Sequence, residues 1–212
     1  MTQDSQDIIE VLKKVGAVIT DSHFVFTSGK HGSVYINKDA LYPHTAETSR
    51  VGEKFAQKFK NKDIDVVAGP ALGGIILSQW TAYHLSILKG KEILGVYTEK
   101  TTDKNQVFTR GYDKLVKAKN VLVIEDLTTT GGSVRKVVDS VKSAGGNVVA
   151  VCVMVNRDSV KVTSEVVGGP FSALGVLPAQ AFAEDECPLC KQNVPINTEV
   201  GHGKKYLESL KG

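Results

Sequence analysis

The stretch NVLVIEDLTTTGGSV, residues 120–134, decides the fold of this 212-residue chain. It opens with a continuous apolar run, which is typical of a strand buried on both faces, and the strand is expected to end at Glu125 and Asp126. A turn of hydroxyl residues and glycine follows, and a helix is expected to begin near Ser133. The turn therefore lies at the amino-terminal end of a helix, where free N–H groups and the helix dipole favour an anion.

This turn has the composition of a phosphate-binding loop. Glycine lets the backbone come close to a ligand, and the hydroxyls supply donors. The turn has no lysine, so it fails the nucleotide pattern G-x-x-x-x-G-K-[ST], and it also lacks the G-x-G-x-x-G of dinucleotide folds. The residues that we expect to bind the phosphate are Thr128, Thr129, Thr130, Gly131, Gly132 and Ser133.

The two acids indicate what else is bound beside the phosphate. Carboxylates repel a phosphate unless they face another part of the ligand, and the vicinal hydroxyls of a ribose are natural donors to Glu125 and Asp126. A Mg²⁺ that bridges hydroxyls and phosphates relieves the repulsion further. The ligand indicated is a 5-phosphorylated ribose. The alternative is an ordinary strand–turn–helix with solvated acids and a capping serine.

Composition excludes several other classes of protein. The net charge of +3 gives no indication of nucleic-acid binding, and no apolar run reaches the ~20 residues that span a bilayer. The first residues lack the pattern of a signal or transit peptide, and three cysteines are too few for a disulfide scaffold. We therefore expect a cytoplasmic protein that binds neither nucleic acid nor a membrane.

The order of elements predicts an α/β fold. Short Val/Ile runs alternate with amphipathic helical segments, which indicates a parallel sheet covered by helices on both faces. In such sheets ligands bind outside the carboxyl ends of the strands, near a switch in strand order. We expect one domain over residues 1–180 and an irregular appendage over residues 181–212.

The stretch at residues 120–134 closely resembles the phosphoribosyl-diphosphate (PRPP) signature of type I phosphoribosyltransferases, and departs from it only at Thr128. The resemblance implies that family's parallel sheet, with a small amino-terminal hood, and Mg²⁺ as cofactor. It also implies a short glycine turn after an earlier strand that binds the pyrophosphate. The segment VVAGPALGGIIL fits this turn, with the expected contacts at Ala71, Leu72, Gly73 and Gly74.

Within the family, residues from about 20 to 180 are most similar to the orotate phosphoribosyltransferases. The similarity assigns residues 20–44 to a segment that covers the base, although a lysine that is usual in these enzymes is replaced by Thr27. It places an arginine that binds the substrate carboxylate after a late strand, and a guanidinium fork suits a planar carboxylate. The base-binding residues implied in this way are Ser28, Lys30, Val34, Tyr35 and Arg157.

The long polar connection at residues 98–119 corresponds by resemblance to a mobile loop that closes over the neighbouring subunit's site in a homodimer. The arginine that usually leads this loop is Glu99 here, whereas Lys100 and Lys104 remain. If the loop acts as it does in the family, one of these lysines meets the pyrophosphate. The catalytic residues implied are Lys100, Lys104 and Asp126.

The appendage contains the pair Cys187-Pro-Leu-Cys190, with His202 further along. One C-x-x-C is half of a zinc site, so a structural Zn²⁺ at Cys187, Cys190 and His202 is one interpretation. A redox pair and free thiols are the others.

Together these features predict the transfer of a 5-phosphoribosyl group from PRPP to orotate, with release of pyrophosphate. Two alternatives stay open: a phosphoribosyltransferase for another base such as a purine, and a non-catalytic regulator that senses PRPP or a nucleotide.

Overall fold

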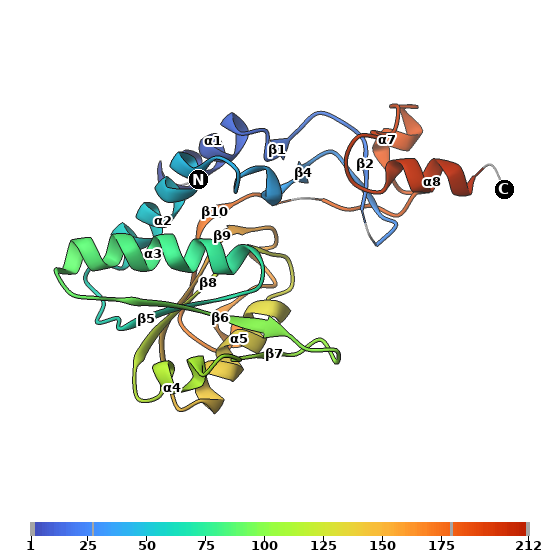
Figure 1. The fold of residues 1–212 in the computed structure, drawn as a ribbon. Coiled ribbons are helices and arrows are strands. Elements are labelled where there is room, and N and C mark those ends of the chain that lie inside the picture. The colour runs from blue at the N-terminus through green and yellow to red at the C-terminus, as the bar shows by residue number, and fades with distance from the viewer. Residues whose placement is uncertain (1–2, 27, 179, 211–212) are drawn as a thin grey trace.

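The fold is seen in a computed structural model, which describes residues 3–26, 28–178 and 180–210. A central sheet has the strand order β10-β9-β8-β5-β6-β7, and β7 alone runs antiparallel to its neighbour. Helices lie above and below this sheet (Figure 1). Its strands are β5 (Val66–Pro70), β6 (Leu94–Lys100), β7 (Gln106–Val107), β8 (Asn120–Thr128), β9 (Asn147–Asn156) and β10 (Phe171–Val176).

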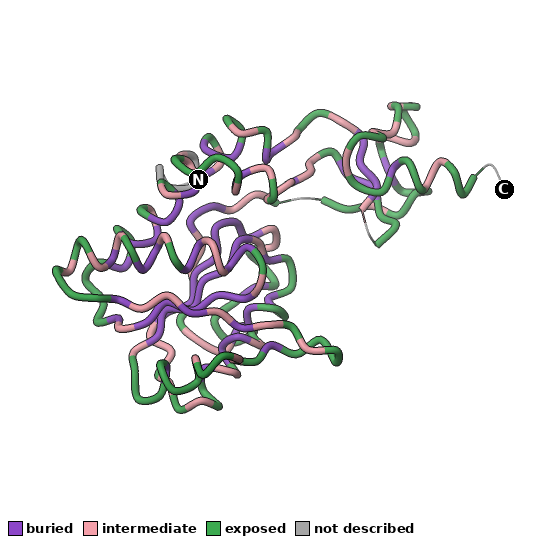
Figure 2. The backbone as a smooth tube through the Cα atoms, in the orientation of Figure 1, coloured by how far each residue is buried: buried purple, intermediate pink, exposed green. Residues whose placement is uncertain are grey.

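Two layers of helices cover the sheet. On one face lie α1 (Gln3–Lys14), α2 (Thr45–Phe59) and α3 (Gly73–Lys89). On the other lie α4 (Tyr112–Val116) and α5 (Gly132–Ser143). The central strands β5, β8 and β9 are mostly buried (Figure 2), so their continuous Val/Ile runs match strands that are covered on both faces.

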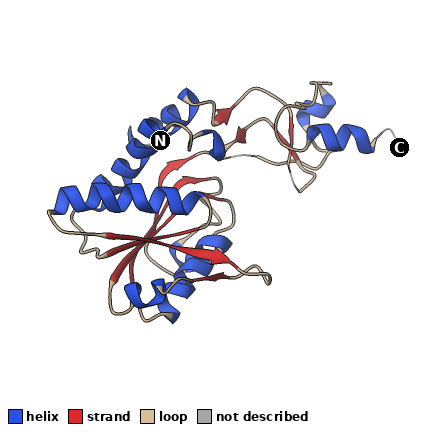
Figure 3. Ribbon diagram, in the orientation of Figure 1, coloured by secondary structure: helices blue, strands red, loops and turns tan. Residues whose placement is uncertain are grey.

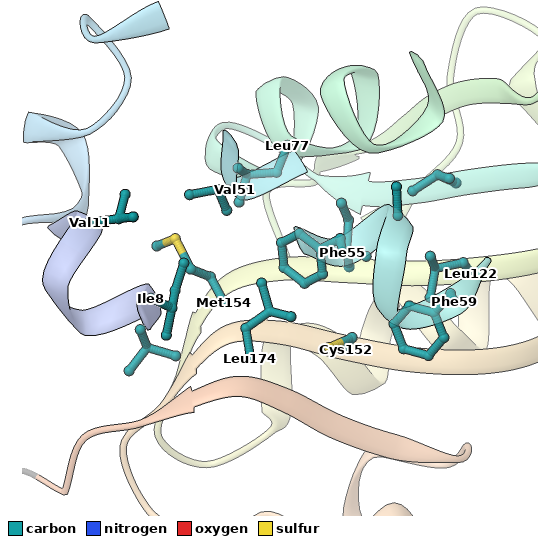
Figure 4. Close-up of a cluster of buried hydrophobic side chains, with 14 of the residues drawn as sticks. Ile8, Val11, Val51, Phe55, Phe59, Leu77, Leu122, Cys152, Met154 and Leu174 are labelled. Atoms are coloured by element: carbon teal, nitrogen blue, oxygen red, sulfur yellow. The ribbon is translucent and has the colours of Figure 1, made fainter. Parts of the chain in front are cut away.

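The larger core lies between the first helical layer and the sheet. In α2, Val51, Phe55 and Phe59 recur every four residues and therefore point to one side of the helix. Figure 4 shows Phe55 and Phe59 in one cluster with Leu122 of β8 and other buried side chains of the sheet. Burying such side chains is worth about 1.5–3 kcal/mol each, which holds the helices firmly against the strands.

The predicted α/β fold with a parallel sheet flanked by helices is confirmed, with two corrections of detail. The strand β8 does not end at Glu125 and Asp126, because Leu127 and Thr128 continue its ladder with β9. The sequence analysis did not identify β10, a strand at the edge of the sheet that is only partly buried and contains a glycine. Short edge strands give weak sequence signals, since neither face is a continuous apolar run.

A smaller lobe lies beside the sheet domain. Here β2 (Phe24–Val25) and β3 (His31–Gly32) form a hairpin, and the chain after residue 180 packs on it with α7 (Pro188–Lys191) and α8 (Gly203–Ser209) (Figures 1 and 3). Backbone hydrogen bonds join His31 to Phe182 in both directions at 2.9 Å. The appendage therefore shares a lobe with the segment expected to cover the base.

Four short elements complete the chain. The strands β1 (Val18–Ile19) and β4 (Tyr35–Ile36) pair between the lobe and α1, and a 3₁₀ helix, η1 (Lys38–Ala40), follows. A single helical turn, α6 (Ser164–Val167), precedes β10. Among the described residues, no helix is both long enough and apolar enough to span a bilayer.

Candidate active site

The strand order changes direction between β5 and β8, and the candidate site lies at that point. The chain leaves β5 through α3 toward β6, whereas it leaves β8 through α5 toward β9 on the opposite side. The loops after β5 and β8 therefore diverge and leave a crevice at the carboxyl ends. A cleft of about 310 Å³ lies there, and its lining residues are Pro70, Ala71, Lys100, Lys104, Gln106, Glu125, Ser133 and Lys136.

The turn after β8 is shaped by its own hydroxyls and glycine. Gly131 has a φ of 77° and precedes α5, and its N–H donates to Thr128 Oγ1 at 2.9 Å. Thr128 is buried, so its hydroxyl holds the turn from inside. The residues that remain exposed at the start of α5, where an anion is favoured, are Thr129, Thr130, Gly132 and Ser133.

The two acids on β8 are buried and adjacent. Glu125 is 7% exposed and Asp126 only 2%. The N–H of Asp126 donates to Glu125 Oε1 at 2.9 Å. Burial first, and the neighbouring Asp126 second, raise the pKa of Glu125 well above its usual value. Glu125 thus lines the cleft as a carboxyl group that holds its proton more tightly than an exposed one.

Asp126 is held by two residues from the segment that follows β4. Lys38 Nζ lies 2.6 Å from Asp126 Oδ2, and the Tyr42 hydroxyl donates to the same oxygen at 2.7 Å. Burial opposes the charge on Lys38, but the Asp126 carboxylate outweighs it and raises the Lys38 pKa. Burial and the same carboxylate also raise the pKa of Tyr42. Lys38 therefore offsets the negative charge of Asp126 beside the turn that follows β8.

The glycine turn after β5 fits against this acidic cluster. A Cβ on Gly73 would stand 1.9 Å from Asp126 Oδ2 and 2.1 Å from the Tyr42 hydroxyl, so only glycine fits there. Leu72 is 80% exposed, and the peptide bond that joins Ala71 to Leu72 is cis. The expected pyrophosphate-binding turn is thus brought against Asp126, and Ala71 lies in the same cleft as Glu125.

The connection after β6 supplies cations to the same cleft. It forms a β-hairpin with β7, and both Lys100 and Lys104 are exposed and line the cleft. Lys136 of α5 donates to the carbonyl of Lys104, which joins the hairpin to the helix after β8. Glu99 accepts from Thr109 Oγ1 at 2.8 Å and pairs with Arg110 at 3.0 Å. Glu99 therefore fixes the base of the hairpin.

Arg157 follows β9 and lies beside the turn after β8, since its backbone N–H donates to the Thr128 carbonyl at 2.9 Å. Its guanidinium lies 5.3 Å from the centre of the Phe26 ring. Its Nε is buried and makes no hydrogen bond with the described residues, and burial lowers the pKa of the group. A buried donor without an acceptor costs about 1–3 kcal/mol, so an acidic ligand would be favoured here.

The other residues expected to bind the base lie on the lobe side of Arg157. Ser28 and Lys30 are exposed at the turn of the β2–β3 hairpin, and Val34 and Tyr35 are partly buried at the start of β4. Thr27 lies outside the described residues.

The zinc ligands expected from the tail are only partly brought together. Cys187 and Cys190 lie with His23 and His31, and the four ligand atoms are all within 4.8 Å of one another. His202 is exposed at the start of α8 and is not a member of this group. The expectation for His202 is corrected, because the hairpin supplies the histidines from more than 150 residues earlier in the chain.

The fold and this cleft are those of a transferase that handles a phosphorylated ribose. The phosphoribosyl transferase domain matches residues 37–166, which cover the sheet up to α6. The chain belongs to the phosphoribosyltransferase family.

Within this family, the chain is similar to proteins that are named orotate phosphoribosyltransferases. The orotate phosphoribosyltransferase of Thermoanaerobacter sp. strain X514 is 37% identical over 193 residues, which cover 91% of this chain and 95% of that protein. The enzyme of the same name from Caldicellulosiruptor bescii is 38% identical over 199 residues, with 93% and 97% covered. The crystal structure of orotate phosphoribosyltransferase from Aeropyrum pernix superposes with a TM-score of 0.63 at 27% identity and covers 80% of this chain and 93% of that one. The resemblance stated from the sequence is confirmed.

Four residues of the site were missed in the sequence. Lys38 and Tyr42 reach Asp126 from a segment that carries no motif, and Gln106 and Lys136 line the cleft from β7 and α5. The spacing of Lys136, three residues after Ser133 on the same helix, was the one available signal, since such residues share a helical face.

Proposed function

We propose that this protein is an orotate phosphoribosyltransferase, which transfers the 5-phosphoribosyl group of PRPP to a ring nitrogen of orotate and releases pyrophosphate. The observation that carries the proposal is the cleft between β5 and β8. It unites a glycine turn, a phosphate-binding turn at a helix start, a buried carboxyl group and the cations of the β6–β7 hairpin. A ligand with a phosphate at one end, hydroxyls in the middle and a second phosphate group at the other end matches this order.

The donor would lie along β8. Its 5-phosphate would accept from the free N–H groups and hydroxyls of residues 129–133 at the start of α5. The ribose hydroxyls would then face Glu125 and Asp126. Since Lys38 already offsets the charge of Asp126, the phosphate and the acids can coexist in one small site.

Magnesium fits the donor set of this site. Oxygen ligands suit Mg²⁺, which keeps several waters and binds through one or two carboxylates together with substrate phosphates. Glu125 is the carboxyl group in the cleft, and its oxygens are of the kind that Mg²⁺ prefers. The ion would neutralise negative charge at the pyrophosphate. Glu125 and Asp126 would be the protein groups that hold it, on the side of the site where the ribose binds.

The chain's own contribution to the reaction would be positioning and charge stabilisation. Displacement at the anomeric carbon passes through a state with oxocarbenium character, in which negative charge develops on the departing pyrophosphate. Lys100 and Lys104 and the turn at residues 70–74 would bind that group in the cleft. No covalent nucleophile is needed, because holding the acceptor nitrogen in line with the anomeric carbon lowers the barrier by itself.

The acceptor would bind on the lobe side of the turn. Orotate carries a planar carboxylate, for which the fork of Arg157 is suited. The buried Nε of Arg157 is a donor without an acceptor among the described residues, and Phe26 holds the plane of the guanidinium. Ser28 and Lys30 on the hairpin, with Val34 and Tyr35, would cover the ring.

A second copy of the chain would complete the enzyme, as the resemblance implies. The exposed surface of α3 supports this part of the proposal, because Tyr83, Ile87 and Leu88 present apolar side chains that are 56%, 61% and 43% exposed. Light scattering after size exclusion would test it. A mass of one chain at all concentrations would reject the homodimer.

The function is tested by measuring pyrophosphate release from PRPP with a panel of bases. We expect turnover with orotate and Mg²⁺, and a loss of at least about tenfold in kcat/KM when Mg²⁺ is removed. Turnover with hypoxanthine or guanine but not orotate would reject the acceptor and support a purine enzyme. PRPP binding by calorimetry without turnover on any base would reject the enzyme and support a regulator.

A further inference from the structure

The cluster of His23, His31, Cys187 and Cys190 lies outside the cleft and is not used by the proposed reaction. His23 Nε2 lies 2.9 Å from His31 Nδ1, and Cys190 Sγ lies 3.2 Å from His31 Nδ1. The two sulfurs lie 3.8 Å and 3.7 Å from His23 Nε2. Two imidazole nitrogens and two thiols thus converge on one point in the small lobe.

Two of these four separations match the edges of a tetrahedral metal centre, and the two shorter ones, at 2.9 Å and 3.2 Å, would lengthen by a few tenths of an ångström around an ion. With Zn–N of about 2.0–2.1 Å and Zn–S of about 2.3 Å, the edges of a tetrahedron are about 3.3–3.8 Å long. Two thiolates and two neutral imidazoles cancel the charge of Zn²⁺, so the centre can be buried without a net charge. His23, His31 and Cys187 are indeed buried.

The surroundings orient one histidine for this role. His23 Nδ1 lies 2.8 Å from the Val194 carbonyl, which can only accept, so the proton is on Nδ1 and the lone pair of Nε2 points into the cluster. Ligating histidines commonly donate their second ring N–H to a backbone carbonyl in this way. Cys187 precedes the single turn α7, which brings Cys190 back to the same side.

We propose that His23, His31, Cys187 and Cys190 bind one structural Zn²⁺, which fastens the carboxyl-terminal chain to the hairpin that covers the acceptor base. A Cys₂His₂ tetrahedron is typical of zinc. Among the described residues of the lobe, the buried apolar side chains are Phe24, Val25 and Cys187. So small a core rarely holds a fold together without a metal or a cross-link.

The zinc would also affect substrate binding, because its ligands flank the hairpin turn proposed to cover the base. This step rests on the proposed function. His31 directly follows Lys30, and His23 precedes Phe24 at the other end of the same hairpin, so the centre fixes both ends of the turn that contains Ser28. Phe26, which begins this turn directly after β2, has the centre of its ring 5.3 Å from the Arg157 guanidinium. Loss of zinc is therefore expected to weaken orotate binding more than PRPP binding.

The direct test is the metal content of the tag-free, full-length protein by mass spectrometry. We expect about one zinc per chain in the wild type, and less than a tenth of that in Cys187→Ser and Cys190→Ser. His202→Gln and Cys152→Ala are matched controls, because they change a histidine and a cysteine outside the cluster, and both should retain zinc. Wild type that binds no zinc after exposure to Zn²⁺, or cysteine variants that retain it, would overturn the proposal.

Two further measurements keep the test informative if a variant fails to fold. Co²⁺ exchanged into the wild type should give the visible bands of a tetrahedral ion together with thiolate charge transfer, and an octahedral spectrum would contradict the site. Removal of zinc from the wild type by a chelator should raise KM for orotate about tenfold and leave KM for PRPP within about twofold. Equal changes in KM for orotate and KM for PRPP would reject the role of zinc in positioning the hairpin. The measured zinc content would still decide whether the cluster binds zinc. A base panel that fails for the wild type would reject the function alone.

Discussion

Glu125→Gln is expected to make the protein more stable and less active. Glu125 is buried beside Asp126, and both effects raise the pKa of its carboxyl group in the folded state. A carboxyl group with a raised pKa binds more protons when folded, so stability falls as pH rises above the ordinary value of 4.5 and levels off once the folded pKa is passed. Glutamine has the same shape and keeps an acceptor for the Asp126 N–H. Because it has no carboxyl group, its burial does not carry the cost of a buried negative charge.

The size of the gain follows from proton linkage. The stability of the wild type relative to the variant changes by at most about 1.4 kcal/mol per pH unit, and the change is confined to pH values between the unfolded and folded pKa. Because the side chain is almost wholly buried, solvent does not screen this cost away. We expect the variant to be the more stable protein at neutral pH, by an amount that can be no larger than this slope multiplied by the distance between the two pKa values.

Urea unfolding at a series of pH values from 4.5 upward measures this difference directly. A second carboxylate provides the control, because the hydrogen bond from Thr109 and then Arg110 lower the pKa of Glu99. A lowered pKa stabilises the fold above the ordinary value, and that stability is lost as pH falls through the folded pKa. Glu99→Gln should therefore lose stability at neutral pH, with the opposite sign to Glu125→Gln.

Binding should change in the other direction from stability. A hydrogen bond to a charged group is worth about 1.5–3 kcal/mol, so Glu125→Gln should weaken PRPP binding by about tenfold or more. A variant that is destabilised at every pH, or whose stability difference from wild type does not depend on pH, would refute the buried-carboxyl argument. Unchanged PRPP affinity would refute the contact with the ribose.

Four other substitutions test separate parts of the site. Gly73→Ala puts a Cβ within 1.9 Å of the Asp126 carboxylate, so we expect a loss of about 1–3 kcal/mol in stability. PRPP should then no longer raise the melting temperature of the variant. A rise equal to that of the wild type would contradict the close packing. Arg157→Lys keeps the charge but loses the forked guanidinium. KM for orotate should therefore rise about tenfold, which corresponds to about 1.4 kcal/mol. Equal changes in KM for orotate and for PRPP would count against carboxylate binding by Arg157. Lys100→Ala and Lys104→Ala should each lower kcat by about tenfold by removing a cation from the cleft, and full activity in both would exclude the hairpin from pyrophosphate binding.

The half of the site that we propose for PRPP could be predicted from the sequence because it is local. Glu125, Asp126 and the turn to Ser133 are consecutive in the chain, and a strand–turn–helix fixes their relative positions without help from elsewhere. The same holds for the turn at residues 69–74. The one error at β8 came from the strand end, where pairing with β9 carries the ladder to Thr128.

The rest could not be predicted, because it depends on contacts between distant segments. Lys38 lies 88 residues before Asp126, and nothing in the segment from residue 35 to 44 indicates that its lysine turns inward toward an acid. The histidines beside the cysteine pair raise the same difficulty, and the nearer His202 was the natural but wrong partner. Spacing rules describe ligands on one element or one loop, so they do not apply when two loops from opposite ends of the chain share a site.

The donor side and the acceptor side of the proposed site are built from different parts of the chain, and this difference bears on the choice of base. The donor side is built from loops of a rigid sheet that the whole fold class shares, whereas the acceptor side depends on how the lobe is placed against Arg157. That placement rests on the Phe26 contact, on the bonds between His31 and Phe182, and on the four-residue cluster. Changes in the lobe should therefore alter the choice of base while PRPP binding is kept. Chimeras that exchange residues 20–33 together with residues 180–210 would show this, and exchange of either segment alone should fail because each carries only half of the proposed zinc ligands.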